Sequence, residues 1–213
     1  MVVENDLLNA VIFIALLIPS IIFHEVSHGA VAARLGDPTA AAAGRLTLNP
    51  LPHIDPFGSI ILPGLLALSG GTVFGWAKPV PVVPRYFQNP AAGMAVTALA
   101  GPATNVVLAI ITGRVILEVF TLEGAWLRAV LIFGLLNATL AVFNMIPIPP
   151  LDGSRLLPLV LSPRGRQFYA RFEQYGLLVI FALVFLWRDG LGTIMRTPIN
   201  IVLEISGMPL RLG

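Results

Sequence analysis

The chain has 213 residues, of which 56% are hydrophobic and 11% are charged. A soluble domain usually carries about a quarter charged residues, so this chain has too few charges to cover a surface that faces water. It has no cysteine, which excludes disulfides, iron–sulfur clusters and thiolate metal sites. Its net charge is +2 and it has no basic tract, so nucleic-acid binding is excluded as well. The composition predicts an all-α polytopic membrane protein surrounded by a lipid bilayer.

The first long apolar run extends from Leu7 to Leu35 and predicts a membrane helix. Gly36, Asp37 and Pro38 follow it, a typical helix ending. The residues before the run are acidic and include no Lys or Arg, and no small-residue cleavage site follows it. We therefore interpret the run as a retained helix and not as a secretory signal peptide.

The next apolar segment is too short to span a membrane. Residues 59–69 would cover only about half of a hydrocarbon core roughly 30 Å thick, at 1.5 Å per residue, so we expect a re-entrant segment there. Residues 70–89 carry Lys78 between two short apolar stretches and contain three prolines. This pattern predicts a β-hairpin or a loop.

Three further apolar runs follow. The first two cover residues 91–120 and 125–146. Residues 175–187 continue the third, which begins near residue 168. The final stretch, residues 191–210, is weaker because Pro198 and Gly207 interrupt it, and it could lie in the membrane interface. We expect a single domain over the whole chain, residues 1–213, with about four to six membrane helices.

A motif with clear chemistry lies at the end of the first run, where residues 24–28 read His-Glu-Val-Ser-His, or HExxH. Helix positions four apart lie about 40° apart on one face, so His24 and His28 can reach one metal ion. Glu25 lies within about 100° of both histidines and can act as a general base. Zinc peptidases use this arrangement. Three titratable groups in an apolar helix are costly without a function, which argues against an incidental motif.

A catalytic zinc ion needs a third protein ligand. The remaining histidine is His53, and the candidate carboxylates include Asp55 and Asp152. Asp152 follows the third long run after several prolines and precedes Gly153, so a turn would present its carboxylate. With Asp152 and Glu25 ionised and both motif histidines neutral, the charge of a zinc site sums to zero, which favours this set in a low dielectric.

These residues resemble the signature of the site-2 protease family of intramembrane zinc metalloproteases, the M50 peptidases. The family's two motifs are HExxH and a downstream Asn-x-x-Pro…Leu-Asp-Gly, which stands here at residues 144–153 in the family's order. The resemblance covers about residues 7–155, the catalytic core, and leaves residues 156–213 as C-terminal helices. It implies a short form of the family, without a PDZ or CBS domain, with a re-entrant segment and a small membrane-associated β-hairpin.

The resemblance implies one zinc ion per chain, held by His24, His28 and Asp152, with Glu25 as the catalytic residue. It also suggests that Asn144 contacts the substrate or steadies the oxyanion.

Three more residues are candidate substrate contacts. Asn105 ends a Gly-Pro-x-x-Asn element that looks like one in the family's next core helix, where packing or gating is the alternative role. Val80 opens a short segment that looks like the family's substrate-binding hairpin. His53 is either a substrate contact, a fourth metal ligand, or a loop histidine that is hydrogen-bonded to Asp55.

The two motifs must meet at one depth in the membrane. The first and third long helices must therefore run parallel, residues 91–120 run back between them, and residues 36–90 make no net crossing. On this topology, eight of the 13 basic residues lie on the motif side. The positive-inside rule then places the active site toward the cytoplasm of a prokaryotic cell, and the acidic N-terminus outside. The eight are Arg34, Arg45, Lys78, Arg85, Arg155, Arg164, Arg166 and Arg171.

The family's substrates are single-span membrane proteins, such as anti-sigma factors or membrane-tethered regulators, which implies regulated intramembrane proteolysis here. Homo-oligomerisation stays open. Two other functions were weighed against an endopeptidase. A non-proteolytic binder with this fold would have lost its metal ligands, and a metal-ion transporter would carry polar residues in several spans, whereas here they gather at one depth.

Overall fold

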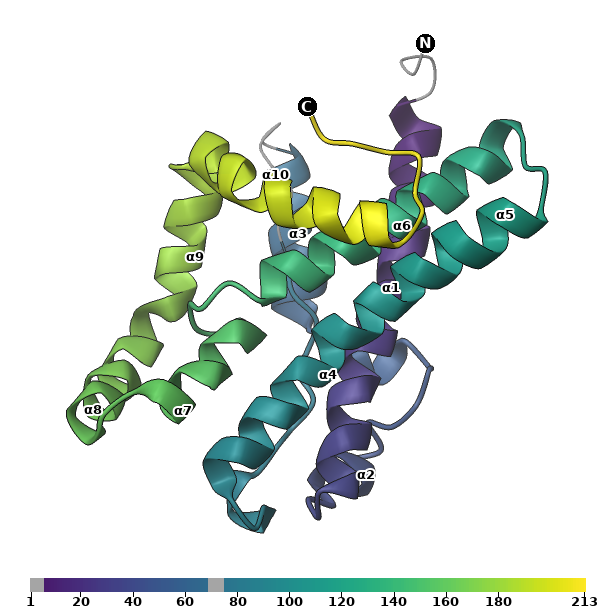
Figure 1. Ribbon diagram of the computed structural model, residues 1–213. Helices are drawn as coiled ribbons and strands as arrows, with labels where there is room; N and C mark the ends of the chain where they lie inside the picture. Colours follow the sequence, from purple (N-terminus) through teal and green to yellow (C-terminus); the bar gives the residue numbers. More distant parts are fainter. Residues whose placement is uncertain (1–5, 69–74) are drawn as a thin grey trace.

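The computed structural model describes residues 6–68 and 75–213, and within these ranges every regular element is a helix (Figure 1). Four helical segments are long and apolar enough to cross a membrane. They are Val11–Arg34, Pro90–Val119, Gly124–Asn144 and Pro163–Phe185. The prediction of an all-α polytopic membrane protein is therefore confirmed, with four spans among the described residues.

Helix α1 (Asp6–Arg34) ends where the sequence predicts. Gly36 adopts a φ of 104°, a left-handed conformation that favours glycine, and the Asp37 N–H turns back to the Ala32 carbonyl at 2.9 Å. A short helix, α2 (Thr39–Ala42), follows.

Helix α4 (Pro90–Ile110) continues through a π-helical turn (Ile111–Ile116) into α5 (Leu117–Val119). Helix α6 (Gly124–Asn144) then returns, and α1, α4 and α6 pack against one another (Figure 1). Most of the residues that α4 and α6 bury are small, which lets the helix backbones approach closely.

Side-chain contacts define the directions of these three helices. Along α1, His24 meets Asn105 and His28 meets Thr97, so α4 runs antiparallel to α1. Along α6, Asn137 meets Ser20, and the loop after α6 brings Asp152 to His24. Helices α1 and α6 are therefore parallel, as the sequence predicts.

The C-terminal part packs on this three-helix core through α10 (Arg188–Ile205). Met195, Ile199 and Leu203 lie on one face of α10 and bury against Ala138 of α6. Helix α10 follows the expected weak apolar stretch and is not one of the four candidate spans. The remaining short helices are Leu51–His53, Pro84–Tyr86, Asp152–Leu156, α7 (Leu157–Val160), α8 (Pro163–Phe172), Glu173–Tyr175 and α9 (Gly176–Phe185).

The expected re-entrant segment is helical where it is described. A π-helical turn (Pro56–Ile61) continues into α3 (Leu62–Leu68), and this helix is shorter than the four candidate spans. The turn of a re-entrant path would fall at residues 69–74, which lie outside the described residues. The re-entrant path therefore stays a prediction.

The predicted β-hairpin is wrong for residues 75–83, which are described and form no strand. Pro79 and Pro81 of this segment have no N–H to give to a neighbouring strand. The N–H groups of Val80 and Val83 donate instead to side-chain carboxylates of Glu25 and Asp37. Residues 70–74 of the expected hairpin, like the acidic residue Glu4, lie outside the described residues.

Candidate metal centre

The two motif histidines project from one face of α1, and each ring is hydrogen-bonded through its Nδ1 to helix α4. The His28 Nδ1 lies 2.7 Å from the Thr97 carbonyl, and the His24 Nδ1 lies 2.5 Å from the Asn105 Oδ1. Both partners belong to α4, and both rings are buried. Because a carbonyl oxygen only accepts, the Nδ1 of His28 carries the proton and its Nε2 presents a lone pair. The two Nε2 atoms lie 3.0 Å apart.

Asp152 completes the cluster from the turn after α6. Its Oδ2 lies 3.1 Å from the Nε2 of His24 and 3.3 Å from the Nε2 of His28. Gly153 is needed beside it, because a Cβ there would overlap the backbone of Met145. These three side chains form a group that could hold a metal ion, and Asp152 is the partly exposed member of the group.

The chemistry of this donor set fits zinc. Two imidazole lone pairs and a carboxylate oxygen face one another, and the buried Asp152 Oδ2 has no hydrogen-bond partner among the described residues. Three acceptors at this distance repel one another unless a cation lies between them. The ligands of a tetrahedral zinc site, with bonds of about 2.0–2.1 Å, lie roughly 3.3 Å apart, close to the separations of 3.0–3.3 Å seen here.

Gly101 of α4 lies directly against the two imidazole rings of the cluster. A Cβ at this position would overlap the Nε2 atoms of both His24 and His28. Only a glycine lets α4 pass this close to the cluster. This gives the Gly-Pro-x-x-Asn element a structural purpose: Gly101 makes room for the metal centre, and Asn105, one turn later, supports His24.

Glu25 lies beside the cluster and accepts a hydrogen bond from residues 78–83, the extended segment before the helix Pro84–Tyr86. Its Oε2 accepts the Val80 N–H at 2.9 Å. Three residues further along, the Val83 N–H donates to the Asp37 Oδ2 at 2.6 Å. The predicted site residues Glu25 and Val80 are thus in contact.

Asp37 is a fully buried carboxylate just past the end of α1. Its Oδ1 accepts from the Thr39 N–H at 2.9 Å and from the Thr39 hydroxyl at 2.5 Å. Burial alone would raise the pKa of Asp37, but the hydrogen bonds from Thr39 and Val83 outweigh burial and hold that pKa below its usual range. Asp37 therefore anchors the extended segment as an ionised group.

The other predicted site residues lie away from the three converging ligand atoms. Asn144 donates to the Leu140 carbonyl at 3.0 Å, within its own helix. His53 is buried, and its Nε2 bonds to the Thr47 carbonyl at 2.9 Å and not to the carboxylate of Asp55. Asp55 caps the helix that begins at Pro56 by accepting the Gly58 N–H at 2.6 Å. The group that could hold a metal ion contains Asp152 and neither His53 nor Asp55.

Two polar residues outside the predicted set, Asn137 and Ser20, extend the hydrogen bonds of the site away from the metal ligands. Asn137 of α6 accepts from the Asn105 Nδ2 at 2.7 Å, and its own Nδ2 donates to the Ser20 hydroxyl at 3.0 Å. All three side chains are fully buried. The available signal was an uncharged polar residue inside an apolar run, a costly placement in lipid unless it has a partner.

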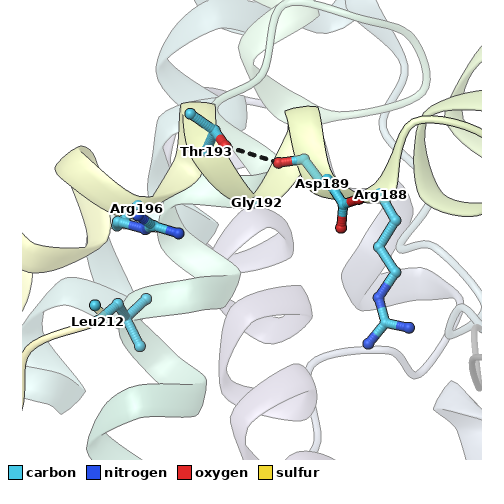
Figure 2. A pocket seen from close by; sticks show the side chains of 7 residues that line it. Arg188, Asp189, Gly192, Thr193, Arg196 and Leu212 are labelled. Atoms are coloured by element: carbon cyan, nitrogen blue, oxygen red, sulfur yellow. Dashed lines mark hydrogen bonds between the residues drawn. The ribbon is translucent and has the colours of Figure 1, made fainter.

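A surface pocket on α10 is separate from this centre (Figure 2). Within it, the Thr193 hydroxyl donates to the Asp189 carbonyl at 2.8 Å, a bond inside the helix. The pocket shares no residue with the His24–His28–Asp152 cluster, so it is not the candidate site. Its lining residues are Arg188, Asp189, Gly192, Thr193, Arg196, Leu212 and Gly213.

Four helices able to span a membrane and a His–His–Asp cluster with two buried histidines define a polytopic membrane protein with a candidate mononuclear metal centre. Comparison with known proteins identifies the class. The model of peptidase family M50 matches residues 118–187, which include Asp152. "Putative zinc metalloprotease YwhC" of Bacillus subtilis is 39% identical over 176 residues, which cover 78% of this chain and 77% of that protein.

More distant relatives carry the same description. Rip2 of Mycobacterium tuberculosis is 32% identical over 195 residues, 91% of this chain and 73% of that protein. MJ0611 of Methanocaldococcus jannaschii is 35% identical over 137 residues, 64% of this chain and 63% of that protein. No solved structure matches the chain. The chain belongs to peptidase family M50 and is a zinc metallopeptidase with several membrane-spanning helices.

Proposed function

We propose that this protein is an intramembrane endopeptidase that cleaves peptide bonds within or near the membrane segments of single-span proteins. The observation that carries the proposal is the position of the cluster. His24 and His28 lie inside a candidate span, and α4, which covers them, is part of another. A metal centre built between spans serves a substrate that reaches it from the membrane.

His24, His28 and Asp152 are the proposed zinc ligands. Their three donor atoms converge. Because Asp152 is partly exposed, we propose that the fourth position of the metal is left there for water or substrate. Zinc bound there supplies Lewis acidity, which polarises the scissile carbonyl and makes water a stronger nucleophile.

Glu25 is the proposed general base. It takes a proton from the attacking water and later delivers it to the leaving amine. One of its carboxylate oxygens now accepts the Val80 N–H, so the extended segment at residues 78–83 lies directly against the base. We propose that this segment meets the unwound substrate and positions the scissile bond beside Glu25.

Asn144 is the proposed oxyanion donor. One of its two amide hydrogens is used by the Leu140 carbonyl, and the second is left for a substrate oxygen. His53 stays a candidate substrate contact through its Nδ1, which has no partner among the described residues, and this contact requires the buried ring to become accessible when substrate binds. Asn105 has no exposed surface, so its support of His24 replaces substrate contact as its proposed role.

We also propose the domain organisation and the setting. Residues 1–213 act as one domain, with residues 156–213 supporting the catalytic core at about residues 7–155. The relatives come from bacteria and an archaeon, which supports a prokaryotic cell membrane. The excess of basic residues on the motif side supports an active site toward the cytoplasm. We propose that the substrates are membrane-tethered regulators, cleaved in regulated intramembrane proteolysis.

Glu25→Gln tests the proposal in proteoliposomes with a single-span model substrate. We expect cleavage to fall by at least about 100-fold, while zinc and substrate binding persist, because only the proton acceptor is lost. Exposed Glu123→Gln is the matched control and should cleave normally. Mass spectrometry of the wild-type products should place the cut within or beside the membrane segment. Full activity of Glu25→Gln would contradict its role, and cuts confined to a distant soluble tail would contradict intramembrane cleavage.

A further inference from the structure

A line of buried polar side chains leads from the metal centre through the three-helix core. It runs from His24 through Asn105 and Asn137 to Ser20, so it crosses from α1 to α4 and α6 and returns to α1. Asn105, Asn137 and Ser20 are fully buried. Uncharged polar groups at the centre of a membrane helix core are expensive unless each has its partner, and here each of them does.

The backbone determines the donor direction at the far end of this line. The Leu16 carbonyl only accepts, so the Ser20 hydroxyl donates to it at 2.8 Å and accepts from Asn137. The Phe133 carbonyl, 2.9 Å from the Asn137 Nδ2, independently requires the amide of Asn137 to point the same way. The Oδ1 of Asn137 therefore faces Asn105.

The same logic carries the direction to the metal centre. Because Asn137 presents an acceptor, Asn105 must present its Nδ2 to it, and a longer contact of 3.4 Å with the Ser20 carbonyl supports that orientation. The Oδ1 of Asn105 then faces the His24 Nδ1 and can only accept. The proton of a neutral His24 must lie on Nδ1, which leaves the Nε2 lone pair for a metal ion.

The two proposed histidine ligands of zinc thus obtain the same tautomer by different means. A backbone carbonyl, that of Thr97, sets His28 directly. The partner of His24 is instead the side-chain amide of Asn105. That amide could rotate by about 180° and present its NH₂ group in place of its oxygen. We propose that Asn137, backed by Ser20, is a positioning residue that prevents this rotation of Asn105 and so keeps His24 competent to bind zinc. The inference rests on the proposed function only in taking His24 as a ligand.

Zinc affinity tests the proposal without relying on activity. Asn137→Leu keeps the side-chain size but leaves the Asn105 amide without its strongest orienting partner. We expect zinc affinity, measured on the purified full chain by competition with a chromophoric chelator, to fall about 10- to 100-fold. Thr112→Val is the matched control, because it removes a fully buried hydroxyl of the π-helical turn after α4, which donates to the Leu108 carbonyl one turn earlier. It should bind zinc like the wild type.

A rescue experiment separates orientation from packing. In the Asn105→Asp background, the group that faces His24 is an acceptor whichever way it turns. Adding Asn137→Leu to this background should then cost less than about 3-fold in zinc affinity, against about 10- to 100-fold in the wild-type background. An equal loss in both backgrounds, or no loss in either, would overturn the proposal. His24→Ala tests the ligand assignment separately: zinc retained at wild-type affinity there would contradict the proposed function itself.

Discussion

At residue 101, a single methyl group would separate α4 from the metal centre. We expect Gly101→Ala to lower zinc affinity at least about 10-fold, because its Cβ would overlap the two Nε2 atoms of His24 and His28. Gly192→Ala is the matched control, since a Cβ there would meet no atom within 4 Å. Because residue 192 is exposed and helical, Gly192→Ala should raise the free energy of unfolding by about 0.4–1 kcal/mol. Zinc content and melting temperature of both variants check the prediction, and an unchanged zinc affinity in Gly101→Ala would contradict the close approach.

Sequence reasoning at this scale works where spacing carries the information. The helical repeat alone places His24 and His28 together, whereas it leaves His53, Asp55 and Asp152 open as the third ligand. Asn137 could not be found in this way, because its partner Asn105 lies 32 positions away on another helix. A polar residue in an apolar run signals that a partner exists, but only the packing of helices identifies that partner.

At the scale of elements, Asp37 joins the end of α1 to the extended segment beside Glu25. Three donors use its two carboxylate oxygens, and an asparagine offers only one acceptor oxygen. We expect Asp37→Asn to release the Val83 N–H, at a cost of about 1–3 kcal/mol. Hydrogen exchange of a peptide covering residues 79–84 should become faster, whereas exposed Asp189→Asn should leave it unchanged. Unaltered protection in Asp37→Asn would show that this carboxylate does not hold the segment.

The contribution of Asp37 to the stability of the protein has a defined pH dependence. The pKa of Asp37 is lower in the folded protein than in the unfolded chain, so its contribution to stability is complete above the unfolded value of about 3.9. The contribution is lost as the pH falls through the lower, folded value. The difference in melting temperature between wild type and Asp37→Asn should therefore be constant from about pH 5 to 8 and should shrink below about pH 4. A difference that disappears near neutral pH would mean that another group is responsible.

The long helices were predictable from apolar runs and their ends, but the β-hairpin was not. The short apolar stretches around Lys78 suggest strands, and Val83 does have an extended backbone. The N–H groups of Val80 and Val83 bond to carboxylates of α1 and the turn after it, a tertiary arrangement with no local signature. Elements defined by their own periodicity can be read from a sequence, whereas a segment that is held by distant side chains cannot.

For the whole molecule, the parallel arrangement of α1 and α6 makes a topology prediction. The chain has no cysteine, so single cysteines can report the side of the membrane. Thr121→Cys, in the loop before α6, and Gln167→Cys, on α8 beyond Asp152, should be labelled from opposite sides by a membrane-impermeant maleimide. We expect Gln167→Cys to react from the cytoplasmic side. Labelling of both from one side would contradict the single crossing by α6.

The central claim is that α1 and the turn after α6 together hold one zinc ion for peptide-bond hydrolysis. The most direct test is the zinc content of purified wild type, Asp152→Ala and Asp55→Ala, with cleavage of a single-span substrate measured on the same samples. We expect one zinc ion per chain and cleavage in the wild type and in Asp55→Ala, and loss of both in Asp152→Ala, because Asp152 reaches the two histidines whereas Asp55 caps another helix. Zinc retained at wild-type affinity by Asp152→Ala would contradict the claim.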